Sequence, residues 1–141
     1  PMLAFTFPGQ GSQQPGMGQP WVDHPSWALV AEASGASGRD VAALLLDADA
    51  DELRRTENAQ LSTYVLSLVV HDAVHALGVR CSVAAGHSLG EYSALTAVGA
   101  RSHIGVSEDI QTVIDGDDDD IAALGQNIAS INRQAAGAET I

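Results

Sequence analysis

Residues 81–98 read CSVAAGHSLGEYSALTAV, and this stretch decides the fold class. The apolar run at residues 81–85 predicts a short strand. Two glycines within residues 86–90 predict a sharp turn, and residues 91–98 have the composition of a helix. Strand, turn and helix follow one another in the order that an α/β layer requires, so we expect an α/β fold with a parallel sheet.

Ser88 lies at the centre of the predicted turn. Gly86-x-Ser88-x-Gly90 fits the nucleophile-elbow pattern, in which a serine in a strained turn between strand and helix presents its hydroxyl to a cleft. The two glycines are needed because strand and helix approach too closely there for a β-carbon. We therefore predict a nucleophilic Ser88, with an ordinary Gly-Ser turn as the alternative. The backbone amide of Leu89, at the start of the following helix, is expected to face the developing oxyanion.

A glycine-rich loop follows the first predicted strand. Residues 2–7 alternate as a strand does, and residues 8–16 contain too much glycine and proline for a regular element. A loop at the end of a buried strand often carries function. It is the expected source of a second oxyanion donor, and a plain surface turn is the alternative.

Two short helices are predicted next, at residues 26–33 and 40–46. A Gly/Ser-rich stretch at residues 34–38 is expected to separate them as a helix breaker.

A long, buried helix is predicted over residues 56–77, with Thr56 as its N-cap and Gly78 as its stop signal. His71 and His75 lie one turn apart on it, a spacing known from helical zinc sites. Two ligands without a third make a weak site, so we expect ordinary polar positions near the end of the helix.

Composition excludes several classes of function. The 141 residues have a net charge of −12, and all six basic residues are arginine. Duplex nucleic acid and anionic membrane surfaces are poor partners for such a charge. No apolar run approaches the roughly 20 residues of a membrane span, and no basic stretch followed by an apolar run suggests a secretory signal. We expect a cytoplasmic protein.

No metal site is predicted. The single cysteine, Cys81, excludes an internal disulfide and a multi-cysteine zinc site, and is expected in the core. The acidic run at residues 115–120 lacks the alternating ligands and terminal glutamate of a calcium loop, so we expect a solvated turn there.

Three motifs together resemble a known family. Residues 5–13 (FTFPGQGSQ), residues 56–60 (TENAQ) and residues 86–92 (GHSLGEY) are similar to malonyl-CoA:acyl-carrier-protein transacylase and the related acyltransferase domains of polyketide and fatty acid synthases. The resemblance covers residues 2–100. It implies that residues 1–100 are the N-terminal part of a large, hydrolase-like α/β subdomain.

Residues 101–141 form a tail that is similar to the opening of the family's small, ferredoxin-like subdomain. An alternative alignment places part of this tail in the family's C-terminal stretch.

The resemblance also implies a mechanism. Ser88 would take an acyl group from coenzyme A and pass it to the phosphopantetheine thiol of acyl carrier protein, in fatty acid or polyketide synthesis. The backbone amides of Gln10 and Leu89 would form the oxyanion hole. Malonyl-CoA and acyl carrier protein are the implied partners, and coenzyme A thioester is a substrate with no permanently bound cofactor. The implied substrate contacts come from the two glycine loops: Gly9, Gly11 and His87.

The sequence departs from the family in two respects. The family's general base is a histidine far downstream of the serine, whereas this chain has only His103 there, in a segment without an alignment. No arginine stands where the family binds the malonyl carboxylate, because Arg101 is too early and Arg133 too late. The general base is therefore unassigned, and a serine without a base is a poor nucleophile.

Two alternatives to the transferase stay open for this reason. One is a serine esterase of the α/β type, and the other is a catalytically incomplete transferase. For a transferase, docking of an acidic carrier protein would need arginines at the docking face. The candidates for that face are Arg54, Arg55 and Arg80.

Overall fold

A computed structural model describes residues 2–99 of the chain. The predictions for the tail, including the ferredoxin-like start, Arg101, His103, the acidic run and Arg133, lie outside this range. In residues 2–99, none of the helices has the length and apolar character needed to cross a membrane.

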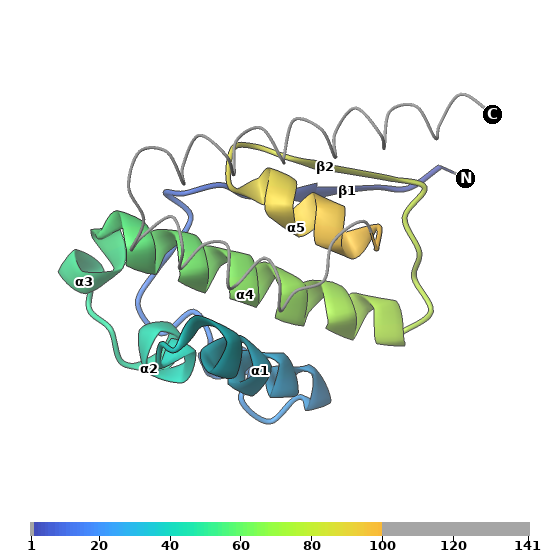
Figure 1. Cartoon of the computed structure of the whole chain (residues 1–141). Coiled ribbons are helices and arrows are strands. Elements are labelled where there is room, and N and C mark those ends of the chain that lie inside the picture. Colours follow the sequence, from blue (N-terminus) through green and yellow to red (C-terminus); the bar gives the residue numbers. More distant parts are fainter. Residues whose placement is uncertain (1, 100–141) are drawn as a thin grey trace.

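Two strands form a small parallel sheet (Figure 1). Strand β1 (Ala4–Phe7) pairs with β2 (Val83–Gly86), and Phe7 lies opposite Gly86 in the register. Helices connect the two strands, as a parallel pair requires. The expectation of an α/β fold with a parallel sheet is confirmed.

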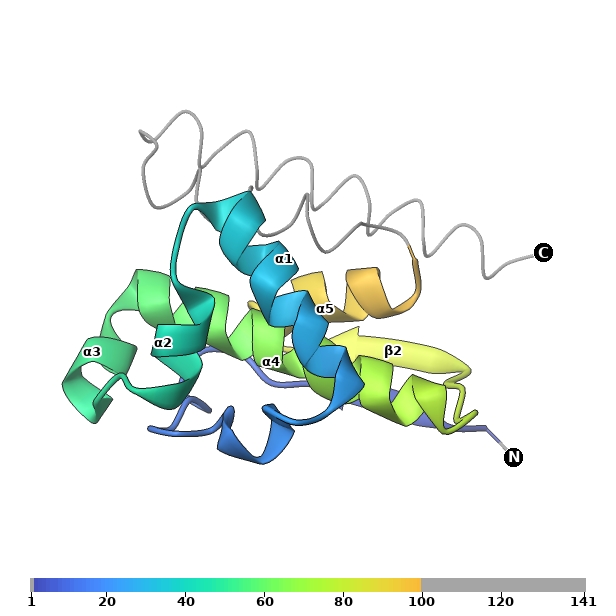
Figure 2. The same cartoon turned by 90° about the horizontal axis from the view of Figure 1, so that it is seen from below.

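Helix α4 (Thr56–Ala76) is the centre of the fold. It lies between the sheet and helix α5 (Gly90–Ala97) on one side and helices α1 (Ala28–Ser37) and α2 (Val41–Leu46) on the other (Figures 1 and 2). Its central residues are almost wholly buried because both sides of the helix are covered. Across this contact, the hydroxyls of Tyr64 on α4 and Thr96 on α5 are hydrogen-bonded at 2.9 Å.

The ends of α4 differ slightly from the prediction. Thr56 is the first helical residue, and the N-cap position belongs to Arg55, whose side chain makes no capping hydrogen bond. At the other end, Gly78 adopts a left-handed φ of 83° and its amide donates to the carbonyl of His75 at 2.9 Å. Glycine adopts this conformation at little cost, so Gly78 ends the helix as predicted.

Helix α1 (Ala28–Ser37) corrects the predicted breaker. Residues 34–37 continue the helix, which ends only at Gly38 with φ 68°. The serine hydroxyls are satisfied without breaking it, because Ser37 donates to the carbonyl of Ala33 at 2.8 Å and Ser34 accepts from the amide of Val41 at 3.1 Å. Before α1, short 3₁₀ helices span Gln19–Trp21 and Pro25–Trp27.

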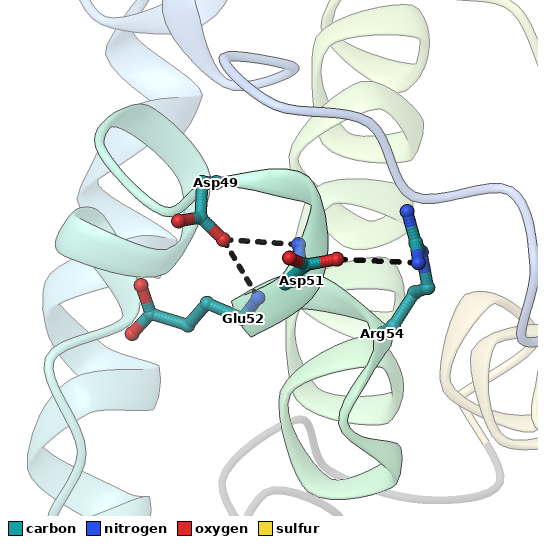
Figure 3. A network of polar contacts seen from close by, with 4 residues as sticks. All are labelled: Asp49, Asp51, Glu52 and Arg54. Atoms are coloured by element: carbon teal, nitrogen blue, oxygen red, sulfur yellow. Dashed lines mark hydrogen bonds and ion pairs between the residues drawn. The ribbon is translucent and has the colours of Figure 1, made fainter.

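Two short helices follow α1. Helix α2 (Val41–Leu46) matches its prediction, whereas α3 (Ala50–Arg54) was not predicted. Asp49 caps α3 by accepting hydrogen bonds from the amides of Asp51 and Glu52 at 2.9 and 2.8 Å (Figure 3). Both short helices pack against α4 and help to bury it.

Candidate functional site

The turn from β2 into α5 is held by close backbone packing around its glycines. A β-carbon on Gly86 would collide with the carbonyl group of Gly90 and the amide of Glu91. A β-carbon on Gly90 would collide with the carbonyl of Phe7, on the neighbouring strand. Only glycine fits at these two positions, which is the packing that the G-x-S-x-G spacing predicted.

Ser88 lies between these glycines with an unusual backbone conformation. Its φ of 53° is positive, and Ser88 alone has this property among the non-glycine residues that the structure describes. The side chain is exposed, and its hydroxyl has no hydrogen bond to any residue between 2 and 99. The carbonyl of Ser88 accepts from the amide of Glu91 at 3.0 Å, which joins the turn to the first turn of α5. Such strain concentrates at functional sites.

The loop after β1 lies directly against this turn. The amide of His87 donates to the carbonyl of Phe7 at 3.3 Å, and a β-carbon on Gly9 would lie 2.5 Å from the carbonyl oxygen of His87. Gly11 has φ 112°, and its amide donates to the side chain of Gln13 at 2.8 Å. The two glycine-rich motifs, far apart in the sequence, are therefore neighbours in space.

The two predicted oxyanion donors lie in these neighbouring segments. Gln10 is exposed in the loop after β1, and Leu89 is buried immediately before α5. Neither backbone amide donates to another described residue. An unused amide is usual at a helix start, and at Leu89 the helix dipole also favours an anion. Within residues 2–99, each amide is thus available to donate a hydrogen bond to a ligand.

Two other predicted site residues lie next to each other. His87 is exposed beside Ser88, and Gly9 is buried against His87. The arginines proposed for docking lie on other elements. Arg54 forms an ion pair with Asp51 at 3.2 Å on α3, and Arg80 donates to the carbonyl of His75 at 2.8 Å near the end of α4. In the described range, neither of these two hydrogen-bonds to the Ser88 turn.

A second feature, which the sequence pattern did not indicate, is an apolar groove of about 410 Å³ between β1 and α4. His71 lies in its wall and packs against the rings of Phe5 and Phe7, with centroids 5.8 and 6.0 Å away. Partial burial and the neighbouring His75 lower the pKa of His71, against a smaller opposing effect of Asp72. Ser88 does not line this groove.

The histidine pair has no third potential metal ligand grouped with it in the described part of the chain. Within residues 2–99, no three His, Cys, Asp or Glu side chains are grouped so that they could hold a metal ion. Asp72, the nearest carboxylate in sequence to His71, accepts from the hydroxyl of Ser26 at 2.7 Å.

Comparison with known proteins agrees with the sequence motifs. The family described as "Acyl transferase domain" matches residues 4–112. A malonyl CoA-acyl carrier protein transacylase of Bacillus subtilis is 46% identical over 103 residues, which are 71% of this chain and 26% of that protein.

Solved structures resemble the described fold as well. An acyl-carrier-protein S-malonyltransferase from Burkholderia pseudomallei has a TM-score of 0.75 at 38% identity, and the match covers 79% of this chain and 37% of that one. A malonyl-transacylase in complex with its type II polyketide synthase acyl-carrier protein has a TM-score of 0.73 at 33% identity, with coverages of 79% and 37%. The chain therefore spans well under half the length of these relatives.

Proposed function

The chain belongs to the acyl transferase domain family, and from this premise we propose that it carries the nucleophile and the oxyanion hole of an acyltransferase that moves a malonyl or similar acyl group from coenzyme A to acyl carrier protein. The observation that carries the proposal is Ser88, which is exposed with φ 53° between β2 and α5 and lies beside the loop that follows β1. A nucleophile elbow would place its serine in such a strained turn between strand and helix, and this supports the proposal.

The first half-reaction would begin at the hydroxyl oxygen of Ser88. This oxygen attacks the thioester carbonyl, and the carbonyl electrons move onto its oxygen to form a tetrahedral oxyanion. The amides of Leu89 and Gln10, which have no acceptor within residues 2–99, would donate to that oxyanion. Collapse of the intermediate breaks the carbon–sulfur bond, releases the coenzyme A thiol with the proton that the serine lost, and leaves an acyl ester on Ser88.

The second half-reaction reverses the roles. The phosphopantetheine thiol of the carrier protein attacks the acyl-serine ester, and Ser88 leaves with the proton of that thiol. The relatives' names support this choice of acyl donor and acceptor over simple ester hydrolysis. His87, Gly9 and Gly11 are proposed to contact the substrate, because they border Ser88 or the loop beside it.

The general base is not among the contacts of Ser88 in residues 2–99. We place it in the part of the acyltransferase that lies beyond the described residues, where the family's histidine would also lie. On this proposal the described part binds and orients the acyl group, and the transfer rate depends on a base that comes from elsewhere.

The test is acyl labelling read by intact mass spectrometry. The 141-residue chain is incubated with malonyl-CoA, and one malonyl adduct is expected, which Ser88→Ala abolishes. Ser82→Ala is the matched control, because Ser82 is also an exposed serine near β2 but lies outside the turn. Added carrier protein with its phosphopantetheine arm should then remove the adduct and gain the malonyl group.

Three results would count against the proposal. An unlabelled chain, under conditions in which the Bacillus subtilis relative is labelled, would mean that these residues do not suffice for the first half-reaction. Label that survives Ser88→Ala would place the nucleophile elsewhere. Turnover of simple esters without transfer to carrier protein would favour the esterase alternative.

A further inference from the structure

Tyr64, in the first half of α4, has the largest fully buried side chain among residues 2–99. Its ring belongs to the same hydrophobic cluster as Leu89, the residue that follows Ser88. A phenylalanine would bury the same ring without a hydroxyl, and a buried hydroxyl is costly unless it is hydrogen-bonded. Packing alone therefore does not account for the hydroxyl of Tyr64.

This hydroxyl begins a chain of hydrogen bonds that ends at the Ser88 turn. The hydroxyl of Thr96 has one hydrogen, which it donates to the carbonyl of Tyr92 at 3.0 Å. In the 2.9 Å contact between the two hydroxyls, Tyr64 is therefore the donor and Thr96 the acceptor. The amide of Tyr92 in turn donates to the carbonyl of Leu89 at 3.1 Å. The chain thus connects the core of α4 with the residue whose amide is the proposed oxyanion donor.

Helix α5, which lies against α4 (Figure 1), buries mostly small side chains. Its buried residues are Gly90, Ser93, Ala94 and Leu95. Small side chains make few van der Waals contacts, so they fix the rotation of a helix less firmly than large ones do. A hydrogen bond has a preferred distance and direction. The bond from Tyr64 to Thr96 therefore fixes a setting of α5 on α4 that small side chains alone would leave loose.

The setting of α5 matters at its first turn, because the helix begins directly after Leu89. An oxyanion donor acts when it lies about 2.7–3.1 Å from the oxygen. A misplacement of about 1 Å by a distant change can slow a reaction by about 10²-fold. A small rotation of α5 would move the Leu89 amide and so weaken the proposed oxyanion hole.

We propose that Tyr64 is a positioning residue of the acyl-transfer site: through Thr96 it holds α5 in the setting that directs the Leu89 amide at the oxyanion. This inference rests on the proposed function of Ser88 and Leu89. Tyr64 itself is fully buried and does not contact the substrate.

The first test is the kinetics of malonyl labelling, followed by intact mass over a range of malonyl-CoA concentrations. Tyr64→Phe keeps the ring and removes only the hydroxyl. The maximal labelling rate should fall about three- to tenfold, which corresponds to the loss of one hydrogen bond. The half-saturating concentration of malonyl-CoA should not change, because the oxyanion forms only in the transition state and its donors do not bind the ground state.

Variants of Thr96 test the same hydrogen bond from its other end. Thr96→Val should slow labelling at least as much as Tyr64→Phe, because it also leaves the buried Tyr64 hydroxyl without this acceptor. Thr96→Ser keeps a hydroxyl and should label as fast as the unchanged chain. The double variant of Tyr64→Phe and Thr96→Val should be no slower than Thr96→Val alone, because both changes remove the same bond.

Ser62→Ala is the matched control on the same helix. Ser62 is also fully buried, but its hydroxyl donates to the carbonyl of Asn58 at 2.6 Å, so this bond stays within α4. Its removal should leave the labelling rate in place.

Hydrogen exchange tests the positioning role without acyl transfer. The amides of Glu91 and Tyr92 donate to the carbonyls of Ser88 and Leu89, so their exchange reports on the turn. It should become about three- to tenfold faster in Tyr64→Phe and should not change in Ser62→Ala. The amides of α1 are the internal reference. If the unchanged chain takes no label but this difference in exchange is present, the proposed function of Ser88 fails and the positioning of the turn by Tyr64 is supported.

Four results would overturn the proposal. The first is unchanged exchange at the turn in Tyr64→Phe, and the second is an equal acceleration at the amides of α1, which would show general destabilisation. The third is a rise in the half-saturating concentration at an unchanged maximal rate. The fourth is labelling that is as slow in Ser62→Ala as in Tyr64→Phe, or as slow in Thr96→Ser as in Thr96→Val.

Discussion

Replacement of Ser88 by glycine should stabilise the fold while it removes the proposed nucleophile. With φ 53°, Ser88 occupies the left-handed region, which costs an ordinary residue about 1–2 kcal/mol. Glycine escapes this cost but loses about 0.5–1 kcal/mol in backbone entropy. The exposed hydroxyl has no partner in the described range, so little else is lost. The free energy of unfolding should therefore rise by about 0.5–1 kcal/mol.

The companion variant Ser88→Ala isolates the backbone contribution. Alanine also removes the hydroxyl but keeps the β-carbon, so the strain stays and the free energy of unfolding should change by less than about 0.5 kcal/mol. For a domain of this size, the gain in the glycine variant corresponds to a rise in Tm of about 2–8 °C.

Differential scanning calorimetry of the three proteins measures this difference, and malonyl-CoA labelling should show that both variants lose the expected adduct. If the Tm of Ser88→Gly is equal to or below the Tm of Ser88→Ala, the positive φ stores no strain and the reasoning is wrong. If the Tm of Ser88→Gly is higher than that of Ser88→Ala, the backbone conformation that positions the Ser88 hydroxyl lowers the stability of the fold.

Three further predictions concern packing, titration and capping. Gly86→Ala should lower the free energy of unfolding by about 3 kcal/mol, because its β-carbon meets backbone that cannot rotate away. Gly35→Ala, in open space within α1, should raise it by about 0.5–1 kcal/mol, and calorimetry that showed equal effects would contradict the packing argument. The lowered pKa of His71 means that the unfolded chain binds its proton more readily than the folded one. The free energy of unfolding therefore carries no penalty from His71 above its ordinary pKa of 6.5, and it falls as the pH drops through 6.5 toward the lowered pKa. Urea unfolding at about pH 7.5 and about pH 5.5 measures how much the free energy of unfolding falls between these two values. This fall should be smaller for His71→Gln than for the unchanged protein. An equal fall would refute the assignment of the pH dependence to His71. Asp49→Ala should lower the free energy of unfolding by about 1 kcal/mol through the lost cap of α3, whereas Asp47→Ala, which removes no capping bond, should leave the urea midpoint in place.

Local chemistry made several elements predictable from the sequence. The stop at Gly78 depends on one residue and its immediate neighbours, and it is present in the structure. The Ser88 turn was predictable for the same reason, because the glycine requirement at Gly86 and Gly90 follows from a strand that runs directly into a helix.

The errors arose where composition was misleading or where an element was too short to show a pattern. The serines at residues 34 and 37 suggested a breaker, but their hydroxyls are satisfied within α1 and by the start of α2. Helix α3 has only five residues, too few to show a helical period, and its one local signal is the cap at Asp49. The groove could not be predicted at all, because it depends on how the edge of β1 lies against α4.

Strand β1 supports the Ser88 turn. One edge of β1 is bonded to β2 and holds the Ser88 turn through the carbonyl of Phe7, which accepts from His87 and leaves no room for a β-carbon on Gly90. The other edge borders the groove. A two-stranded sheet is marginal by itself, and a partner that binds only the folded state stabilises it in proportion to the logarithm of its concentration over Kd. A partner that covers this edge should therefore also stabilise the Ser88 turn and the loop after β1, where we propose the second oxyanion donor.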